Sequence, residues 1–276
     1  MNENVKILCC YYKENEFVPS DDIYFPIQCG KASTGLNLKM QGDDIGDNIS
    51  ARNQFWSEIT GLYWFWKNMK PVDCVGLCSY RRFFNFNHSR FMPMIKILQK
   101  SNYAKINDIK IPNIARILSK YDIVTPKKYW YAYSLYNVNR MNYYIDDFKI
   151  LQDIIHELYP EYDVAFIELL RKHNFVYGHN MFIMKWSLFD DYCKWVFDIL
   201  LEAERRIDAS NYPIDKIRVF GYMHELLLTL YIFKNNLKNY QSQINWVTDE
   251  VSKSQFNSLK YKIACKCSFF FNKPRN

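Results

Sequence analysis

Residues 75–84 read VGLCSYRRFF: an apolar run reaches Cys78, and two adjacent arginines, Arg81 and Arg82, follow between aromatic residues. The apolar part is typical of a buried strand, which we expect over residues 72–78. In open α/β sheets, ligands bind outside the carboxyl ends of the strands. A guanidinium keeps its charge and presents a planar fork of donors to a phosphate. The stretch therefore predicts either an anion site at the end of a strand or a surface arginine pair with ordinary ion-pair partners.

Strands and helices alternate on both sides of this stretch. Apolar and β-branched runs predict strands at 5–12, 121–125 and within 174–184, and helical spacing predicts helices at 52–68, 91–98, 109–118, 145–158, 188–207 and 219–233. This alternation is typical of an α/β layered fold. Because the sequence shows neither an internal repeat nor a linker, we expect one domain over residues 1–250, followed by a basic tail over 251–276.

Composition narrows the functional classes. The 276 residues carry a net charge of +7, and 18% of them are aromatic. Such an aromatic share suits a carbohydrate-facing cleft or a membrane interface, and an AT-rich genome would produce it as well. The eight cysteines include no CxxC pair, and the chain shows neither a leader pattern nor an 18-residue apolar run, so we expect a cytoplasmic protein.

The tail concentrates the positive charge. Residues 251–276 contain no acidic residue but six basic ones: Lys253, Lys260, Lys262, Lys266, Lys273 and Arg275. The rest of the chain is nearly balanced, which argues against nucleic acid as a partner. Apolar residues recur in the tail at spacings of three and four, at Phe256, Leu259, Ile263, Cys267 and Phe270. The pattern predicts a basic amphipathic helix on an anionic membrane, and the alternative is a terminal helix docked on the body with its lysines in water.

Three sets of polar residues are candidates for a functional site. Residues 42–50, GDDIGDNIS, offer Asp43, Asp44 and Asp47 for a divalent metal such as Mn²⁺ or Mg²⁺, or a turn that caps the next helix. Glu58 lies on the aromatic helix, and Glu225 follows His224 inside an apolar helix, so either carboxylate is a candidate general base or a solvent-facing residue. His179 and Asn180 follow Gly178 at a turn where polar groups could face a ligand.

Several stretches together resemble one family. These are IGDNIS with Asn53 after it, SEITGLYWFWKN, VGLCSYRRFF, HNMFIMKWSLFDDYCKWVFDIL and RVFGYMHELL, in the order that the family shows. The chain resembles a bacterial glycosyltransferase family of capsule and O-antigen polysaccharide loci, long carried as a domain of unknown function, with members similar to galactofuranosyltransferases. It departs from the family pattern at Tyr12, Ser79 and Tyr143, where histidine is usual, and at Leu226, where arginine is usual.

The resemblance implies a GT-A-like fold, a Rossmann-type α/β sandwich with a mostly parallel central sheet flanked by helices. It implies an enzyme that moves galactofuranose or another hexose from a nucleotide-diphospho-sugar, with UDP the expected nucleotide, to a lipid-linked glycan at the inner face of the cell membrane. A non-catalytic carbohydrate-binding or scaffold protein of the same machinery is the alternative. The absence of GxxxxGK[ST] and GxGxxG motifs disfavours a kinase or NTPase.

The resemblance also assigns roles to the candidate residues. No Asp-x-Asp motif follows residues 72–78, so we expect Arg81 and Arg82 to neutralise the diphosphate directly, with no required cofactor and an optional divalent metal. Glu225 is the first candidate base and Glu58 the second. The expected nucleotide-binding residues are Tyr11, Tyr12, Asp47, Asn48, Ser50, Asn53, Tyr80, Arg81 and Arg82. The expected sugar- or acceptor-binding residues are Trp64, His179, Asn180 and His224.

Overall fold

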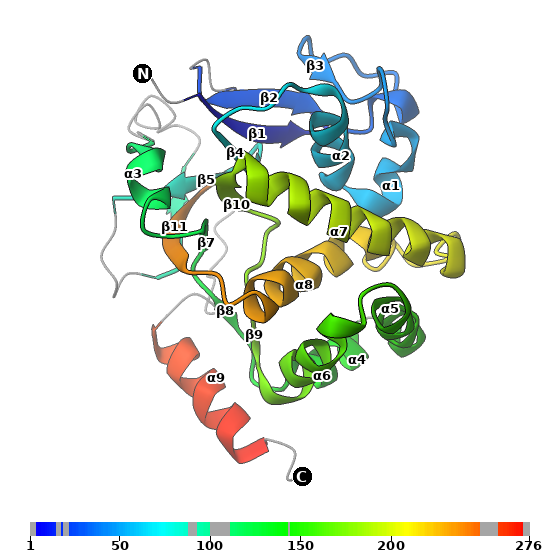
Figure 1. The fold of residues 1–276 in the computed structure, drawn as a ribbon, viewed down its shortest axis with the longest axis vertical. Coiled ribbons are helices and arrows are strands. Elements are labelled where there is room, and N and C mark those ends of the chain that lie inside the picture. Colours follow the sequence, from blue (N-terminus) through cyan, green and yellow to red (C-terminus); the bar gives the residue numbers. More distant parts are fainter. Residues whose placement is uncertain are drawn as a thin grey trace.

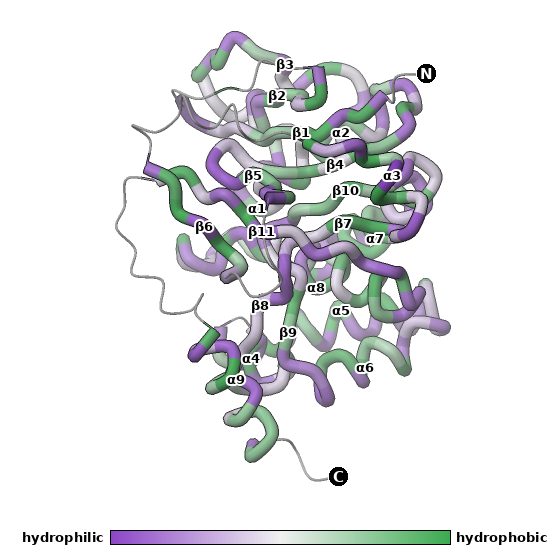
Figure 2. The backbone as a smooth tube through the Cα atoms, turned by 90° about the vertical axis from the view of Figure 1, so that its left-hand side faces the viewer, coloured by the Kyte–Doolittle hydropathy of each residue, from purple (hydrophilic) through white to green (hydrophobic). Residues whose placement is uncertain are grey.

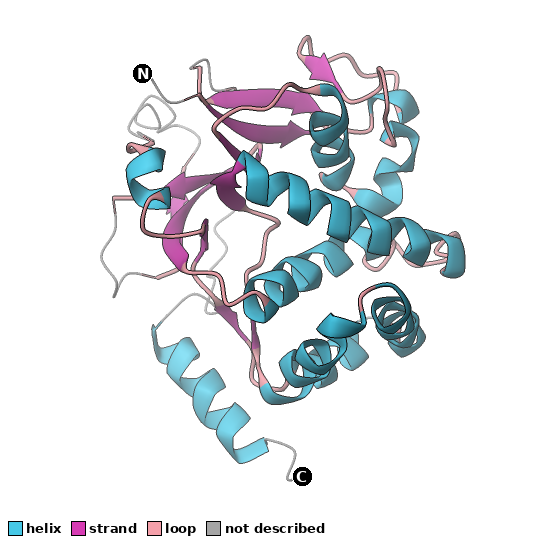
Figure 3. Cartoon of the chain, in the orientation of Figure 1, coloured by secondary structure: helices cyan, strands magenta, loops and turns pink. Residues whose placement is uncertain are grey.

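The computed structural model describes residues 4–14, 18, 22–87, 93–99, 111–142, 144–248 and 259–272. A central sheet is flanked by helices (Figures 1 and 3). Its strands are β1 (Val5–Tyr11), β2 (Tyr24–Gln28), β3 (Gln41–Gly42), β4 (Cys74–Ser79), β5 (Arg82–Asn85), β6 (Ile95–Leu98), β7 (Ile123–Pro126), β10 (Phe182–Lys185) and β11 (Asn239–Val247). A separate two-stranded sheet pairs β8 (Tyr129–Trp130) with β9 (Phe175–Val176).

The central sheet is mixed, which corrects the expectation of a mostly parallel one. Strands β3, β2, β1 and β4 are parallel neighbours, as in a Rossmann-type sheet. On the other side of β4, however, β10 runs antiparallel to both β4 and β7. β5 turns straight back from β4 and pairs antiparallel with β11. The hairpin between β4 and β5 consists of Tyr80 and Arg81, so the arginine pair lies at the carboxyl end of β4.

Alternate residues of the strands face two apolar layers, as the two-residue period of a strand requires. In β1, Leu8 and Cys10 pack into the layer under the large helices, whereas Ile7 and Cys9 pack into the layer on the other face. The first layer is covered by α2 (Ile59–Asn68), α5 (Ile145–Leu158), α6 (Asp163–Lys172), α7 (Trp186–Arg206) and α8 (Val219–Lys234), and the second by the short α3 (Ile114–Leu118). Hydrophobic colour runs along the central strands in Figure 2.

Two predicted helices differ from the structure. Residues 95–98 form strand β6, which pairs with β11, although we expected a helix over 91–98. A short apolar run does not distinguish strand from helix by periodicity, which explains the error. The helix predicted over 52–68 is broken: α1 (Asn53–Trp56) ends at Ser57, whose φ is +55°, and α2 begins at Ile59. The break turns Glu58 out of the helical register.

The remaining elements complete the helical layer. The short α4 (Leu135–Asn142) packs on α6, and α7 packs on both α5 and α8 (Figure 1). Helix α9 (Leu259–Asn272) contacts β8. Within the described ranges, none of the helices is both long and apolar enough to span a membrane. Phe256, Tyr143, Lys253, Lys273 and Arg275, which were singled out above, lie outside the described residues.

Candidate active site

A cavity of about 460 Å³ opens at the carboxyl ends of β1 and β4. This volume lies in the range of small-molecule sites. Its wall brings together residues from five separate parts of the chain: Cys10, Tyr11, Tyr12, Cys29, Asn53, Gln54, Ser57, Glu58, Ser79, Tyr80, Arg81, Arg82, Tyr212, Ile214, Ile217 and Arg218. Six of the nine predicted nucleotide-binding residues are among them, which agrees with the rule that ligands bind outside the carboxyl ends of strands.

The two arginines are held in place by the sheet. Arg82 pairs with Ser79 across the hairpin, and the Val247 N–H donates to the Arg81 carbonyl over 2.8 Å. The Trp246 ring lies 5.3 Å from the Arg81 guanidinium carbon and 4.8 Å from that of Arg82. Such stacking fixes the plane of a guanidinium without using its N–H donors. The Nε of Arg82 is buried and has no hydrogen-bond partner among the described residues.

Positive charge dominates this end of the cavity. Burial lowers the pKa of Arg82, and neighbouring Arg81 lowers it further, while the carboxylates of Glu58 and Glu225 act in the opposite direction. A third arginine, Arg218, lies in the same wall. Fixed guanidinium groups in a partly desolvated cavity interact with an anion more strongly than they would in water.

Two tyrosines line the cavity beside the arginines. The hydroxyl groups of Tyr12 and Tyr80 lie 3.4 Å apart, and their rings meet edge to face. Burial acts to raise the pKa of Tyr12, but the hydrogen bond to Tyr80 and the cations of Lys13, Arg218 and Arg81 outweigh it and lower that pKa. Burial and the same hydrogen bond raise the pKa of Tyr80 to about 12. Tyr12 is 47% exposed, so its ring is accessible to a ligand.

The two candidate carboxylates both interact electrostatically with Arg82 but lie in different surroundings. Glu58 belongs to the cavity wall. Glu225, on α8, is not part of that wall, and its Oε1 accepts a hydrogen bond from the His179 N–H over 3.0 Å. Burial and repulsion from Glu58 raise the pKa of Glu225 to about 7, against the opposing effect of Arg82. Glu225 is thus poised between its two protonation states near neutral pH.

A buried chain of hydrogen bonds orients Glu58. The Asn180 side-chain amide donates to Glu58 Oε1 over 3.1 Å, and the Asn180 Oδ1 lies 2.8 Å from His224 Nδ1. His224 Nε2 in turn lies 3.0 Å from the Tyr192 hydroxyl. Burial lowers the pKa of His224 to about 3, so the ring is neutral. Since Asn180 Oδ1 can only accept, His224 carries its proton on Nδ1 and accepts from Tyr192. This chain fixes the amide of Asn180 with its NH₂ toward Glu58.

Close approach of backbone makes this arrangement possible. His179 and Asn180 adopt positive φ values of 70° and 51°, which turns both residues toward α8. A Cβ at Gly221 of α8 would lie 3.4 Å from both Ser57 Cβ and the Trp56 carbonyl oxygen, so α8 packs directly on the break after α1. His179 Nε2 is buried without a partner among the described residues, and burial together with Arg82 and Arg81 lowers the pKa of His179 to about 3.

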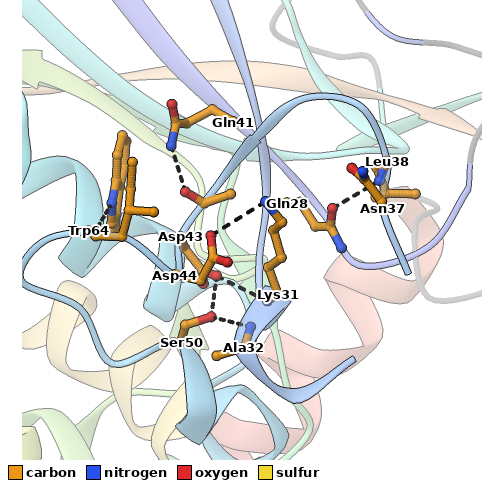
Figure 4. A network of polar contacts seen from close by, with 12 residues as sticks. Gln28, Lys31, Ala32, Asn37, Leu38, Gln41, Asp43, Asp44, Ser50 and Trp64 are labelled. Atoms are coloured by element: carbon orange, nitrogen blue, oxygen red, sulfur yellow. Dashed lines mark hydrogen bonds and ion pairs between the residues drawn. The ribbon is translucent and has the colours of Figure 1, made fainter. Parts of the chain in front are cut away.

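The acidic loop of residues 42–50 does not converge on a metal site. Asp43 is fully buried and accepts from the Gly30 N–H, the Lys31 N–H and the Ser50 hydroxyl (Figure 4). Asp44 pairs with Lys31 Nζ at 3.6 Å, and Asp47 accepts from the Tyr63 hydroxyl. Across the described part of the chain, no group of three metal-binding side chains is found. These contacts hold the loop in place.

Several predicted binding residues do not line the cavity wall. Asp47 and Asn48 close the 42–50 loop on itself and on Asn68. Ser50 is buried against Asp43. The predictions for Trp64 and His224 as sugar-facing residues disagree with the structure: Trp64 is 4% exposed and its indole donates to the Ile45 carbonyl, while His224 is fully buried behind Asn180.

Four residues at the cavity were not predicted from the sequence as site residues. They are Trp246, which stacks on both arginines, and Tyr212, Ile217 and Arg218, which complete the far wall. Arg218 opens the quoted run RVFGYMHELL, so its position just before an apolar helix was an available signal. Trp246 lies on β11, whose polar sequence NYQSQINWV gave no strand signal.

Comparison with known proteins gives three results. Residues 6–236 match the family model described as a domain of unknown function, DUF4422. The solved apo structure of a WbbM bifunctional glycosyltransferase is similar, with a TM-score of 0.78 and 32% sequence identity over 89% of this chain and 46% of that chain. The present chain thus spans about half the length of that protein. The search of curated proteins gave no match.

These results confirm the expected α/β fold as one similar to a glycosyltransferase structure. Because the family model covers far more than half of the sequence, the chain belongs to the DUF4422 family.

Proposed function

We propose that this chain is a glycosyltransferase that moves a hexose from a nucleoside-diphosphate sugar to a hydroxyl group of a glycan. Similarity to the WbbM bifunctional glycosyltransferase supports the reaction class. The resemblance described above supports the finer assignments: UDP as the nucleotide, galactofuranose or another hexose as the sugar, and a lipid-linked glycan at the cytoplasmic face of the membrane as the acceptor.

One observation carries the proposal: Arg81 and Arg82 lie at the carboxyl end of β4, stacked on Trp246 and facing a cavity of about 460 Å³. Sugar transfer breaks the bond between the anomeric carbon and the diphosphate oxygen, so negative charge grows on the departing nucleoside diphosphate. Guanidinium groups that are fixed before the reaction stabilise that charge without reorganising.

The acceptor hydroxyl must lose a proton as it attacks the anomeric carbon in a direct displacement. The geometry favours Glu58 as the base, because Glu58 lines the cavity and Asn180 holds its carboxylate. We therefore place Glu58 before Glu225, the reverse of the order expected from sequence. Glu225 would act indirectly, through its electrostatic interaction with Glu58 and Arg82, which both affect its own ionisation.

Other residues of the same cavity wall can contact the nucleotide. Tyr12, just after β1, and Asn53, at the start of α1, line the cavity with the arginines and can contact the base and ribose, whereas Tyr11 is almost fully buried. Arg218 faces the same space from the segment before α8 and can reach the diphosphate or the sugar. The proposed reaction requires no cofactor, and the loop aspartates take no part in it.

The decisive experiment compares Arg82→Ala with Arg116→Ala, an exposed arginine on α3 that serves as the matched control. Arg82→Ala should lower turnover by about 10²–10³-fold, the usual cost of removing one preorganised donor, and should weaken UDP binding. Turnover is measured as sugar release from UDP-, GDP-, CMP- and dTDP-sugars. An Arg82→Ala variant as active as the control would refute the role of the arginine.

The alternative is a carbohydrate-binding scaffold that keeps the cavity without the chemistry. It predicts that nucleotide sugars raise the melting temperature but that neither an acceptor glycan nor long incubation releases free nucleotide. Sugar release that is lost in Glu58→Gln, with UDP binding retained, would exclude the scaffold.

A further inference from the structure

Helix α9 lies against the small sheet through one side only. Cys265, which is 2% exposed, faces the body, and the hydroxyl group of Tyr129 on β8 is hydrogen-bonded to that of Tyr261. Lys266 and Lys262 place their ammonium groups 4.5 and 5.8 Å from the Trp130 ring. In Figure 1 the helix projects at the end of the molecule away from β1 and β2.

The outward side of α9 is apolar. With about 100° of rotation per residue, Leu259, Ile263 and Phe270 fall within about 40° of arc, roughly opposite Tyr261 and Cys265. These three side chains are 56%, 54% and 76% exposed. Phe271, next to them, is 81% exposed. A terminal helix that only docks on its own body turns its apolar stripe inward, whereas α9 turns it outward.

Lysines border this stripe. Lys262 and Lys266 lie on one side of it and Lys260 on the other, and all three are exposed. Lys127 and Lys128 add charge from the loop before β8. Burial lowers the pKa of Lys128, and repulsion from Lys266 and Lys262 lowers it further. The lysines are therefore close enough to repel one another, and an anionic surface would relieve that repulsion.

We propose that the face formed by Leu259, Ile263, Phe270 and Phe271 with the bordering lysines docks on an anionic phospholipid bilayer. The apolar stripe would enter the boundary between headgroups and acyl chains, while the lysines would stay at the level of the phosphates. Charge complementarity selects this occupant, because an apolar stripe with two lysines on one side and one on the other matches an apolar layer under a negative surface. Such docking does not depend on the reaction proposed above.

Sedimentation with vesicles tests the docking. Wild-type protein should bind vesicles of phosphatidylcholine mixed with phosphatidylglycerol, bind pure phosphatidylcholine far more weakly, and be released by salt. The double variant Lys262→Ala/Lys266→Ala should bind about 30-fold more weakly, since a lysine near an anionic surface contributes about 1 kcal/mol. Phe270→Ser should lose about ten-fold, because part of an aromatic side chain no longer enters the bilayer.

Matched controls separate docking from general effects of charge and hydrophobicity. Lys120→Glu reverses a charge beside α3, at the other end of the molecule (Figure 2), and Val164→Ser removes an apolar side chain that is 78% exposed on α6. Both should bind vesicles as the wild type does.

The outcomes are distinct. Equal binding by wild type and the α9 variants would overturn the proposal. So would a stable dimer that the α9 variants abolish in the absence of lipid, because the stripe would then pair with a second copy. Circular dichroism and UDP binding show whether each variant is folded, and neither signal should change.

Discussion

Replacing Glu225 with glutamine should stabilise the protein at neutral and higher pH. The carboxyl has a pKa of about 7 in the folded protein, against 4.5 when unfolded, because burial and the neighbouring Glu58 disfavour its charge. Between these two values the folded state binds more protons than the unfolded state, so stability falls as the pH rises. Glutamine keeps the shape and still accepts from the His179 N–H, but it carries no charge to desolvate.

The magnitude follows from the two pKa values. A difference of about 2.5 pH units corresponds to about 3 kcal/mol at about 1.4 kcal/mol per unit. Glu225 as a whole residue is only half-buried, so solvent screening reduces the expected gain to about 2–3 kcal/mol. The gain should be absent at pH 4, where both states are protonated, grow through pH 5–7 and stay constant above about pH 8.

Urea denaturation of wild type and variant across this pH range measures the effect. Glu161→Gln, which removes the same charge from an exposed position, is the matched control. A stability difference between wild type and Glu225→Gln that does not grow from pH 4 to pH 8 would refute the reasoning. A variant less stable than wild type at pH 8 would refute it as well.

Three further predictions concern the surroundings of the site. Gly30→Ala should lower the free energy of unfolding by about 1–3 kcal/mol, because φ is +70° and the new Cβ would lie 2.6 Å from the Asn53 side chain. Gly35→Ala, with open space around the new Cβ, should lower it far less. Thermal melting of both variants measures the difference. Asp43→Asn should lower the free energy of unfolding by about 2 kcal/mol, because the hydrogen bonds to Gly30 and Ser50 become weaker. The loss should be the same with and without Mn²⁺. If Mn²⁺ stabilised the wild type but not the variant, this prediction would be contradicted. His224→Leu should lower kcat by up to about a hundred-fold with little change in UDP binding, because Glu58 loses its orientation. Steady-state kinetics with an unchanged kcat would contradict the role of the hydrogen-bond chain in orienting Glu58.

The strands and long helices could be predicted because their burial is one-sided or complete. β1, β4 and β7 read as apolar runs, and α5 and α8 as long helical segments, and the structure confirms them within a few residues. β11 could not be predicted, because its buried residues include Gln243 and Asn245, whose side-chain oxygens each accept a hydrogen bond from the side-chain amide of Asn85. Hydrophobic periodicity does not detect a strand buried through paired amides.

The candidate site was predictable where chemistry and strand ends coincide, as at Arg81 and Arg82. It was not predictable where the direction of a side chain decides whether the residue faces the cavity or the core. Trp64 and His224 have suitable side chains, but each points from its own helix, α2 and α8, into the core. Glu58 faces the cavity because the chain leaves the helical path at Ser57, a break that no proline or glycine announces. Trp246 reaches the arginines through the pairing of β11 with β5, which depends on contacts far apart in sequence.

The central claim is that fixed guanidinium charge at the end of β4 binds the diphosphate of the donor. A crystal structure of the protein with UDP tests it most directly. We predict diphosphate oxygens within about 3 Å of the guanidinium nitrogens of Arg81 and Arg82. A UDP molecule bound with its diphosphate away from both arginines would contradict the account.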